Sequence, residues 1–482
     1  MYKRPSKRTQ RLQLFALYSV MSVTVVVVVA LLVLVVANYG FNRETGTLEQ
    51  RGLMQFASIP SGANVTIDGS QLSSRTSTKQ SVDPGEHSFM IHRDGYESWK
   101  LTTKVPEGSL VWLNYARLVP QKRVNQPIST YASVAASSAA PDKKSIILQY
   151  DQSRPVFRLV DIARDQPSGK DIILSSTLFD EPAEGQVPTF SLGGWDEGGR
   201  YILVRYTLGD KTDVLVVDTR NPDQSVNVSR EFSLPITQAV LSGRSGNILY
   251  IVSEGSLRKV DISGGTVSRS LVSGVEKFSL YDTNTIAFTA QVHNEGVNSR
   301  IAGIYHEGDN EPTILKTVKQ DTSLSIATST YYGSTYTAIA DGTKLTLYKG
   351  HYDQGIKGLE RITEKTLPAA ITQVEFNDVG SYVLARSETS FTSYSLERKL
   401  FSTVDIPVAA KDLYWLDSMH LGLIVDGILT MRDIDGTNKH DLTAVSGAHK
   451  GVLSRNGTYL YSIGDGADGE AVQLQRFRMI LK

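Results

Sequence analysis

From about residue 125 onward the sequence repeats one unit, in which short strands alternate with turns rich in Asp, Asn and Gly. The second and most apolar strand of each unit is expected to begin near residues 146, 201, 248, 285, 336, 382, 421 and 459. The intervals between these starts run from 37 to 55 residues, and strand units recurring every ~40–50 residues are typical of β-propeller blades. A unit of three or four short strands cannot bury both faces of its sheet alone, so neighbouring units must stack.

The turns of the repeat resemble those of TolB-type β-propellers, where a turn similar to Ser-Pro-Asp-Gly-Lys precedes a strand. The clearest copies span 136–147, 195–203, 241–249, 376–384 and 453–460, and weaker copies centre on 285–288, 336–339 and 421–424. Residues 431–438, followed by Leu442 and Thr443, are similar to the hairpin that ends a blade in that group. The Trp-Asp and Gly-His dipeptides of WD repeats are largely missing. Eight units predict eight blades, or seven if the first unit lends only one strand to close the ring.

The stretch 132–140 is rich in Ala and Ser and has the composition of a flexible linker. However, Pro141-Asp142-Lys143-Lys144 occupies the turn position of the repeat. We therefore expect 132–140 to contain the opening strand of the first blade. This leaves residues 121–128 as the linker, and a propeller that spans 125–482.

A smaller β unit is predicted over 54–120, where short alternating strands are separated by Asp-Gly and Pro-Gly turns. It resembles the PEGA domain through an ordered set of motifs. These are Ile59-Pro60-Ser61-Gly62-Ala63-Asn64-Val65-Thr66-Ile67-Asp68-Gly69, Pro84-Gly85-Glu86-His87, Gly95-Tyr96-x-x-Trp99 and Leu118-Val119-Pro120. The sequence departs from the family at 73–77, where the turn is expected to be reshaped. The spacing predicts a compact antiparallel unit.

The resemblance implies a surface-exposed β-sandwich of envelope proteins that has no catalytic residues. The motif positions Pro60, Gly62, Ala63, Val65, Ile67, Asp68, Gly69, Gly85, His87, Gly95, Tyr96 and Trp99 are then structural. The glycines permit turns, Ile67 and Trp99 fill the core, and Asp68 accepts hydrogen bonds from turn amides. A metal site at His87 would need His92 from across a strand, and we favour the structural interpretation.

The segment Leu14–Ala37 contains 24 residues without a charge. A helix of this length is about 36 Å long, which suffices to cross a hydrocarbon core of about 30 Å. No second apolar run of this length follows, so a single span is predicted. The fold class is thus an all-β ectodomain with one N-terminal transmembrane helix, consisting of a small PEGA-like β-sandwich and a β-propeller.

The flanking charges predict the orientation of this helix. Residues 1–13 hold five basic residues and no acid, whereas Arg43 is the one basic residue shortly after the helix. This bias places the basic tail 1–13 in the cytoplasm and the rest outside. The alternative is a signal peptide cleaved after Val35-x-Ala37, although its apolar stretch is longer than the ~7–15 residues usual there. The sequence has no cysteine, which is typical of bacterial envelope proteins and uncommon in small eukaryotic ectodomains.

Composition and motifs exclude several chemistries. Lys+Arg and Asp+Glu both number 50, so the chain lacks the basic excess of a protein that binds nucleic acid. Without cysteine there are no disulfides, thiolate metal sites or thiol nucleophiles. The eight histidines form no metal-binding spacing, and there is no Gly-x-Ser-x-Gly elbow. Fragments of calcium loops at 433–436 and 465–470 are interpreted as hairpin turns. We therefore predict no catalytic, cofactor or metal residues.

The favoured function is a membrane-anchored binding or scaffold protein of the cell envelope, whose propeller loops contact a protein or glycan. The alternative is an envelope hydrolase or lyase whose site is assembled in the propeller channel, and a third hypothesis is a transmembrane sensor. Tyr331-Tyr332 and Tyr414-Trp415 are candidates for a binding face or for strand packing. Clustered acids or histidines in the channel would favour the enzyme, whereas an aromatic, weakly charged mouth would favour binding.

If Leu14–Ala37 remains in place, the protein should stay with the membrane fraction after a carbonate wash, because the helix is held by lipid rather than by surface charge. The measurement is an immunoblot of the pellet and the supernatant, with N-terminal sequencing. Recovery of a soluble chain that begins at Asn38 would show instead that signal peptidase removes the helix.

Overall fold

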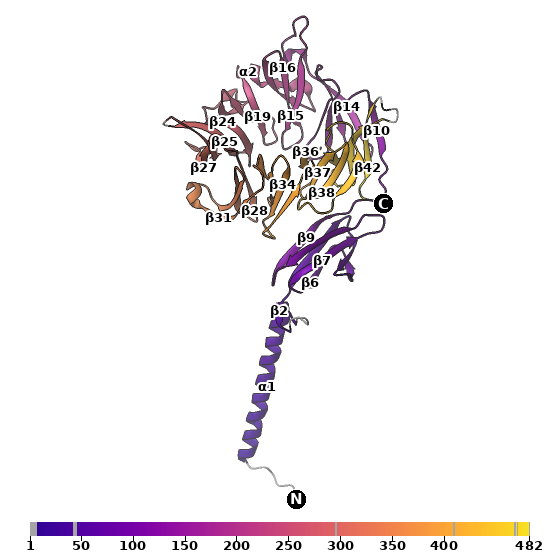
Figure 1. Ribbon diagram of the computed structural model, residues 1–482, viewed down its shortest axis with the longest axis vertical. Helices are drawn as coiled ribbons and strands as arrows, with labels where there is room; N and C mark the ends of the chain where they lie inside the picture. Colours follow the sequence, from indigo (N-terminus) through magenta and orange to yellow (C-terminus); the bar gives the residue numbers. More distant parts are fainter. Residues whose placement is uncertain are drawn as a thin grey trace. The chain divides into compact units, whose positions relative to one another are not determined.

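The computed structural model describes residues 7–41, 46–294, 296–407, 410–466, 469 and 471–481. The chain divides into two compact units, Met1–Gln121 and Lys122–Lys482 (Figure 1). Short 3-10 helices lie at η1 (Ser176–Leu178), η2 (Pro222–Gln224) and η3 (Gly355–Gly358), and a single helical turn α2 lies at Val228–Glu231. Apart from these turns and one long N-terminal helix, the regular structure of the described residues is β.

The N-terminal helix α1 spans Lys7–Val36. It begins earlier than the predicted apolar segment because charged residues such as Arg8 and Arg11 continue the helix. It ends where Asn38 adopts a positive φ of 59°. Among the described residues, Arg11–Val36 is the one stretch long and apolar enough to cross a membrane. Lys3 and Arg4 of the predicted cytoplasmic tail lie outside the described residues.

The first unit continues with a short ribbon and two sheets. The ribbon pairs β1 (Tyr39–Phe41) with β2 (Leu48–Gln50). The strands of the two sheets are β3 (Gly52–Ile59), β4 (Asn64–Ile67), β5 (Ser70–Arg75), β6 (Thr78–Val82), β7 (Gly85–His92), β8 (Trp99–Val105) and β9 (Leu110–Arg117). Their orders are β6-β3-β9 and β5-β4-β7-β8. The predicted reshaped turn at 73–77 is partly strand, because β5 continues to Arg75.

The prediction of a wholly antiparallel first unit is wrong. Strand β9 pairs parallel to β3, with Met54 opposite Val111. The chain leaves β8 in one sheet and enters β9 in the other through the turn 106–109, so the direction of β9 is determined by that crossing and not by a local hairpin. The two strands are more than fifty residues apart in the sequence, so no single turn connects them and no turn motif indicates that they pair.

The core of the first unit lies between its two sheets. Burial alternates along β3 and β8, as expected for strands with one buried face. The rings of Phe56 and Phe89 lie 5.7 Å apart, and Trp99 packs edge-on against Tyr115 at 5.5 Å. Trp99 is fully buried as predicted. Ile67 is only half-buried, because it is the last residue of β4 before the exposed Asp68-Gly69 turn.

Residues 122–482 form eight antiparallel sheets (Figure 1). The first four consist of β11 (Ala136–Ala139), β12 (Ser145–Gln149), β13 (Val156–Asp161), β14 (Ser168–Ile173); β15 (Thr189–Trp195), β16 (Tyr201–Leu208), β17 (Lys211–Asp218), β18 (Val226–Asn227); β19 (Ile236–Ser242), β20 (Ile248–Ser253), β21 (Ser256–Asp261), β22 (Thr266–Val267), with β23 (Val272–Ser273) also on β21; and β24 (Val275–Leu280), β25 (Thr285–Asn294), β26 (Val297–His306), β27 (Thr313–Lys319). We number the sheets one to eight in chain order.

The remaining sheets consist of β28 (Leu324–Tyr331), β29 (Ser334–Asp341), β30 (Lys344–Gly350), β31 (Leu359–Thr366); β32 (Gln373–Phe376), β33 (Tyr382–Arg386), β34 (Ser390–Ser395), β35 (Leu400–Asp405); β36 (Ala410–Trp415), β37 (His420–Val425), β38 (Ile428–Asp433), β39 (His440–Ala444); and β40 (Val452–Leu453), β41 (Tyr459–Asp465), β42 (Val472–Arg478) with β10 (Gln126–Tyr131). Each of the eight predicted second strands begins within two residues of its expected start. The predicted opening strand in 132–140 is β11.

Sheet eight is completed by a strand from the start of the unit. Strand β10 pairs antiparallel with β42, with Tyr131 opposite Val472. The first repeat unit forms a complete sheet of its own, and the closing strand comes from the residues before it. The predicted linker 121–128 was therefore too long, because residues from Gln126 onward belong to β10. Pro127 makes this strand difficult to recognise in the sequence, because proline is uncommon within strands. The pairing has a bulge between Pro127 and Ser129.

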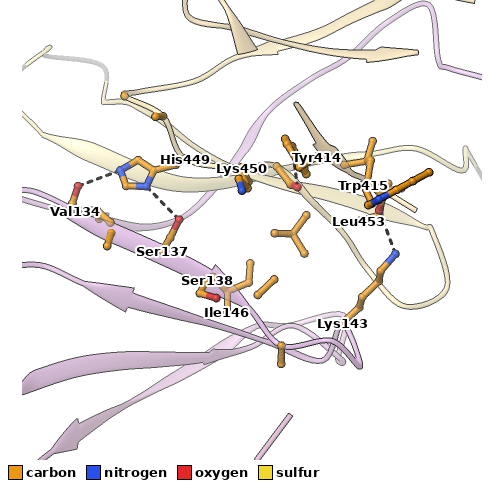
Figure 2. Close-up of a pocket in the computed structure, with 18 of the residues that line it drawn as sticks. Val134, Ser137, Ser138, Lys143, Ile146, Tyr414, Trp415, His449, Lys450 and Leu453 are labelled. Atoms are coloured by element: carbon orange, nitrogen blue, oxygen red, sulfur yellow. Dashed lines mark hydrogen bonds between the residues drawn. The ribbon is translucent and has the colours of Figure 1, made fainter. Parts of the chain in front are cut away.

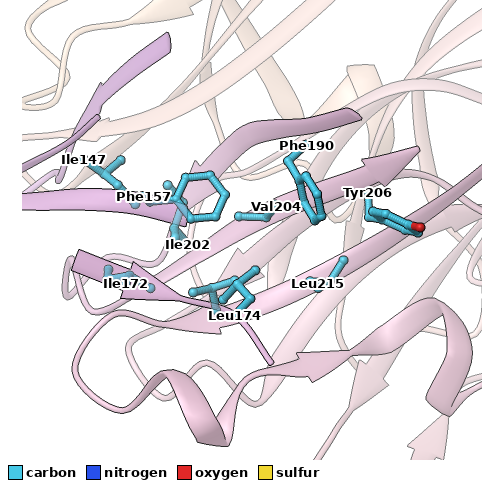
Figure 3. Close-up of a cluster of buried hydrophobic side chains, with 10 residues drawn as sticks. Ile147, Phe157, Ile172, Leu174, Phe190, Ile202, Val204, Tyr206 and Leu215 are labelled. Atoms are coloured by element: carbon cyan, nitrogen blue, oxygen red, sulfur yellow. The ribbon is translucent and has the colours of Figure 1, made fainter. Parts of the chain in front are cut away.

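Neighbouring sheets pack face to face. Ile147 and Phe157 of sheet one meet Phe190 and Ile202 of sheet two in one buried cluster (Figure 3). Comparable clusters join the sheets from two to seven in succession, and another joins sheet eight to sheet one. Sheets seven and eight are joined by the hydrogen bond from the Tyr414 hydroxyl to the Gly451 carbonyl, at 3.1 Å. The sheets therefore follow one another in a closed circuit.

Deletion of residues 447–482 removes three of the four strands of sheet eight and exposes one face of sheet one. The whole propeller should then unfold, since each sheet depends on both neighbours. In differential scanning calorimetry the larger transition should disappear, while a smaller transition from the 52–120 unit remains. A truncated chain that kept both transitions would contradict the closed circuit.

Candidate functional site

The first strands of the sheets contact one another around the circuit. Strand β11 contacts β15, β15 contacts β19, β19 contacts β24, and β28 contacts β32. Two cavities open between such first strands: one between β11, β36 and β40, and one between β24, β28 and β32. Each cavity therefore lies where three sheets converge. In a propeller this is the channel side of the ring.

The first cavity has a volume of about 770 Å³ and joins sheets one, seven and eight (Figure 2). We call it the aromatic cavity. Its distinctive side chains are Tyr414 and Trp415 from β36, Lys143 from the turn after β11, and His449 and Lys450 from the segment before β40. One of the two aromatic pairs that the sequence indicated thus lines a cavity.

Tyr414 is fixed in place by its surroundings. Its hydroxyl donates to the Gly451 carbonyl at 3.1 Å, and the Lys450 ammonium lies 5.5 Å from its ring centroid. Gly422 makes room for the ring, because a Cβ atom at that position would lie 2.6 Å from Cζ of Tyr414. Burial raises the pKa of the Tyr414 hydroxyl, so the phenol stays neutral and keeps its donor at physiological pH.

Trp415 presents an aromatic surface with an available donor. The indole is half-buried and packs against the core between sheets six and seven, beside Leu421. Among the described residues, none accepts a hydrogen bond from its indole nitrogen. The next residue, Leu416, accepts a hydrogen bond at 3.1 Å from the Lys143 ammonium of sheet one. The cavity wall therefore combines a rigid ring, an N–H group and a lysine held across the circuit.

His449 joins sheet eight to the start of sheet one. Its Nε2 lies 3.0 Å from the Val134 carbonyl and its Nδ1 lies 3.1 Å from the Ser137 hydroxyl (Figure 2). A carbonyl oxygen only accepts, so Nε2 carries the proton and Nδ1 accepts from Ser137 in the neutral ring. Burial lowers the pKa of His449, and the contact with Val134 only partly offsets this.

The aromatic cavity has a weak and one-sided charge. Lys143 and Lys450 are its charged side chains, and the ionisable rings of Tyr414 and His449 are neutral at physiological pH. Within the described part of the chain, no carboxylate lines it. An aromatic, weakly charged surface is suited to binding a partner by contact area and hydrogen bonds.

The second cavity, of about 710 Å³, has a lining of mixed polar and apolar side chains. Hydroxyl groups line it from all three first strands, with Ser279 on β24, Ser329 on β28 and Thr372 beside β32. Its two carboxylates already have partners. Glu375 forms an ion pair with Arg386, and Asp378 accepts a hydrogen bond from the Ser418 hydroxyl at 2.9 Å.

The other aromatic pair lies outside both cavities. Tyr331 ends β28 and Tyr332 occupies the two-residue turn before β29, with a φ of 46°. The two rings lie 4.4 Å apart, and Tyr332 is 81% exposed. This pair therefore stands on the surface at a hairpin tip.

A buried histidine with two carboxylates lies in sheet seven. Nδ1 of His420 is 2.7 Å from Asp417, and Nε2 is 3.3 Å from Asp433. Burial alone would lower the pKa of His420, but the two carboxylates raise it to about 9. This cation is stabilising below the unfolded-state pKa of about 6.5, and the stabilisation is lost as the pH rises through about 9. None of these three residues lines a cavity described above, so we assign the cluster to holding the turns of sheet seven.

The calcium-loop fragment at 433–436 makes turn contacts. Asp433 accepts from the Asn438 amide at 2.9 Å, and Asp435 accepts from the Thr437 hydroxyl at 2.6 Å. In the fragment at 465–470, Asp468 and Glu470 lie outside the described residues. Among the residues that the structure describes, no three His, Asp or Glu side chains are arranged so that they could hold a metal ion together.

The PEGA motif residues occupy core and turn positions. Pro60, Ala63, Val65, Tyr96 and Trp99 are buried, and Gly62, Gly69, Gly85 and Gly95 have positive φ. Asp68, instead of binding its own turn, accepts from the Ser88 amide at 2.8 Å and lies 2.6 Å from His87. Burial would raise the pKa of Asp68, but these two contacts lower it. His92 lies on the same strand as His87, five residues on and thus on the opposite face, so the strand arrangement assumed for a metal pair was wrong.

Comparison with known proteins agrees with this division. Residues 52–120 match the PEGA domain family. No curated protein matches the chain in sequence. Among solved structures, the chain is similar to the Dos1 propeller, with 14% identity over 76% of this chain and 95% of that chain and a TM-score of 0.45. It is also similar to dipeptidyl peptidase 4 of Porphyromonas gingivalis, with 12% identity over 72% of this chain and 58% of that chain and a TM-score of 0.47. For an oligogalacturonate lyase in complex with manganese, the identity is 10% over 74% of this chain and 98% of that chain, and the TM-score is 0.42.

The match to the PEGA family and the eight successive sheets of the second unit confirm the predicted fold class, in which a PEGA domain precedes a β-propeller. The similar structures include a peptidase and a lyase as well as the Dos1 propeller, all at identities of 14% or less and TM-scores below 0.5. They therefore carry no argument about activity.

The contacts of His449 predict a pH dependence. The unfolded ring takes up a proton below about pH 6.5, whereas the folded ring resists it, so the contribution of His449 to stability should fall between pH 7 and pH 5. The contribution of His420 changes in the opposite direction near pH 6.5, because its folded ring is already charged there, and comparison with a His449 variant separates the two. His449→Gln should cost about 1–2 kcal/mol at pH 7 by weakening two hydrogen bonds. It should also flatten the pH dependence of the propeller transition in calorimetry, and parallel curves for the two proteins would contradict this role.

Proposed function

We propose that this protein is a membrane-anchored, extracytoplasmic binding protein of the cell envelope, which engages a protein or glycan partner at the aromatic cavity. The observation that carries the proposal is the wall formed by Tyr414 and Trp415, with Lys143 and Lys450 beside it. Aromatic rings held rigidly contribute a large contact area at a low cost in conformational entropy. Such groups are enriched at the centres of binding interfaces.

The location is supported by three features. Helix α1 is exposed and apolar over Arg11–Val36, the basic residues precede it, and a PEGA domain follows it at 52–120. In this proposal the helix spans the membrane once, the N-terminus is cytoplasmic, and both β units lie outside. The absence of cysteine from the sequence is in keeping with a bacterial envelope.

The test replaces the aromatic surface while keeping the packing. Trp415→Leu retains an apolar side chain against Leu421 but removes the ring and its N–H group. Full-length protein in neutral detergent is used to capture ligands from isolated envelope material, and each captured protein or glycan is then titrated directly. We expect affinity to fall by about tenfold or more, which corresponds to about 1.4 kcal/mol.

The matched control is Tyr332→Leu, which removes an exposed aromatic ring outside the aromatic cavity. This variant should bind like the wild type. Equal affinities for the wild type and Trp415→Leu would exclude the aromatic cavity as the binding site. Release of a cleaved product from a captured glycan or peptide, abolished by a substitution in the second cavity, would support the alternative of a hydrolase or lyase.

A further inference from the structure

A third cavity lies at the seam where sheet eight meets sheet one. It has a volume of about 450 Å³ and is lined by Lys144 before β12, by residues 162–165 after β13, by the turn 454–456 and by Tyr459. It shares no lining residue with the aromatic cavity. We call it the seam cavity.

Two arginines of β42 pack against its tyrosine, although neither of them lines the cavity itself. In the antiparallel register Arg478 lies opposite Tyr459, and Arg476 lies opposite Tyr461. The guanidinium carbons of Arg476 and Arg478 lie 4.1 Å and 4.9 Å from the Tyr459 ring centroid. Nη2 of Arg478 also donates to the Tyr459 hydroxyl at 2.6 Å. Both arginines are half-buried, so their planes are held in place while most N–H donors remain unused.

The cations around this cavity outnumber their acidic partners. Lys144 pairs with Asp142 at 3.2 Å, and Arg164 lies 3.9 Å from Asp161. In contrast, no ion pair joins Arg455, Arg476 or Arg478 to a carboxylate of the described residues. The one carboxylate that lines the cavity is Asp165. A concentration of like charge without partners raises the energy of the folded chain and attracts an anion.

The donors of the seam cavity fit phosphate. Guanidinium groups present paired N–H donors in a planar fork that matches two phosphate oxygens, and such contacts are stronger than neutral hydrogen bonds. The Ser454-Arg455-Asn456 turn adds further polar side chains at the rim. Tyr459 is only 7% exposed, because the arginines cover it, so it offers no face on which a nucleobase could stack.

We propose that the seam cavity binds phosphate groups of an anionic ligand, supplied either by a phosphate polymer or by the headgroup of a phospholipid. Arg455 is the accessible anchor at the rim, and Arg476 and Arg478 supply positive charge from the neighbouring strand, where they pack against Tyr459. The ligand bridges the turn 454–456 of the last sheet and the turns of the first sheet. Binding should therefore also stabilise the closed circuit.

The experiment measures binding of inorganic polyphosphate to the full-length protein in neutral detergent micelles by isothermal titration calorimetry. Arg455→Glu is the test variant because Arg455 is exposed on a turn, so charge reversal there should not disturb the fold. The matched control is Arg244→Glu, an exposed turn arginine of sheet three that lies on another cavity. We expect Arg455→Glu to weaken binding by at least about tenfold and Arg244→Glu to change it by less than about twofold.

Two further measurements are made. The first identifies the source of the phosphate, and the second uses a variant that keeps the positive charge to test the contribution of the guanidinium geometry. Titration with glycerophosphoglycerol, a soluble headgroup with one phosphodiester, should give saturable binding if a lipid is the ligand and none if a polymer is needed. Arg478→Lys keeps the charge but loses the planar fork, and it should lower affinity while the salt dependence of binding remains similar.

Three results would overturn the proposal. These are the absence of binding to both phosphate probes, equal loss of affinity in Arg455→Glu and Arg244→Glu, and tighter binding of single-stranded DNA than of polyphosphate. The second would show general electrostatic attraction, and the third a nucleic-acid ligand. None of them depends on Trp415, so failure here is distinct from failure of the aromatic cavity.

Discussion

Every sheet of the propeller depends on the apolar contact with its neighbours. A four-stranded sheet has two faces, and clusters such as Phe157 against Phe190 and Ile202 bury one face of each of two sheets. The last such contact, between sheet eight and sheet one, exists only because the chain returns β42 to the beginning of the unit, where β10 completes its sheet. Closure of the circuit is thus the constraint on which the stability of the remaining sheets depends.

Both proposed binding sites lie along this closure. The aromatic cavity needs Lys143 from sheet one, Trp415 from sheet seven and His449 from before sheet eight, so it exists only in the closed circuit. The seam cavity needs the turns of sheet one and the Tyr459 ring of sheet eight. The region where the two ends of the propeller meet therefore combines rigid apolar packing with half-buried polar side chains. This combination holds the side chains of both proposed sites at fixed positions.

Patterns of neighbouring residues in the sequence predicted those strands and turns that depend mainly on neighbouring residues. The second strand of each sheet was found from the sequence because an Asp/Gly turn precedes a run of apolar residues, as at Tyr201 and Tyr382. Strand β10 was missed since it is polar and contains Pro127, and its partner β42 lies more than three hundred residues away. The parallel pairing of β3 and β9 was also missed, because these two strands lie more than fifty residues apart and share no turn. Tyr414-Trp415 could be identified as an aromatic pair, but the grouping of Arg455, Arg476 and Arg478 around Tyr459 requires the register of β41 and β42.

Hydrogen exchange of individual segments tests closure of the circuit most directly. If β10 and β42 close the propeller, the hydrogen-bonded amides of 129–131 and 473–476 should exchange only through global unfolding, as slowly as those of β29 in sheet five. The native full-length protein is compared with and without low concentrations of denaturant by mass spectrometry. Equal protection that declines together with denaturant is the result that the closed circuit predicts. Fast exchange of β10 while β29 remains protected would show that the ring opens at this seam.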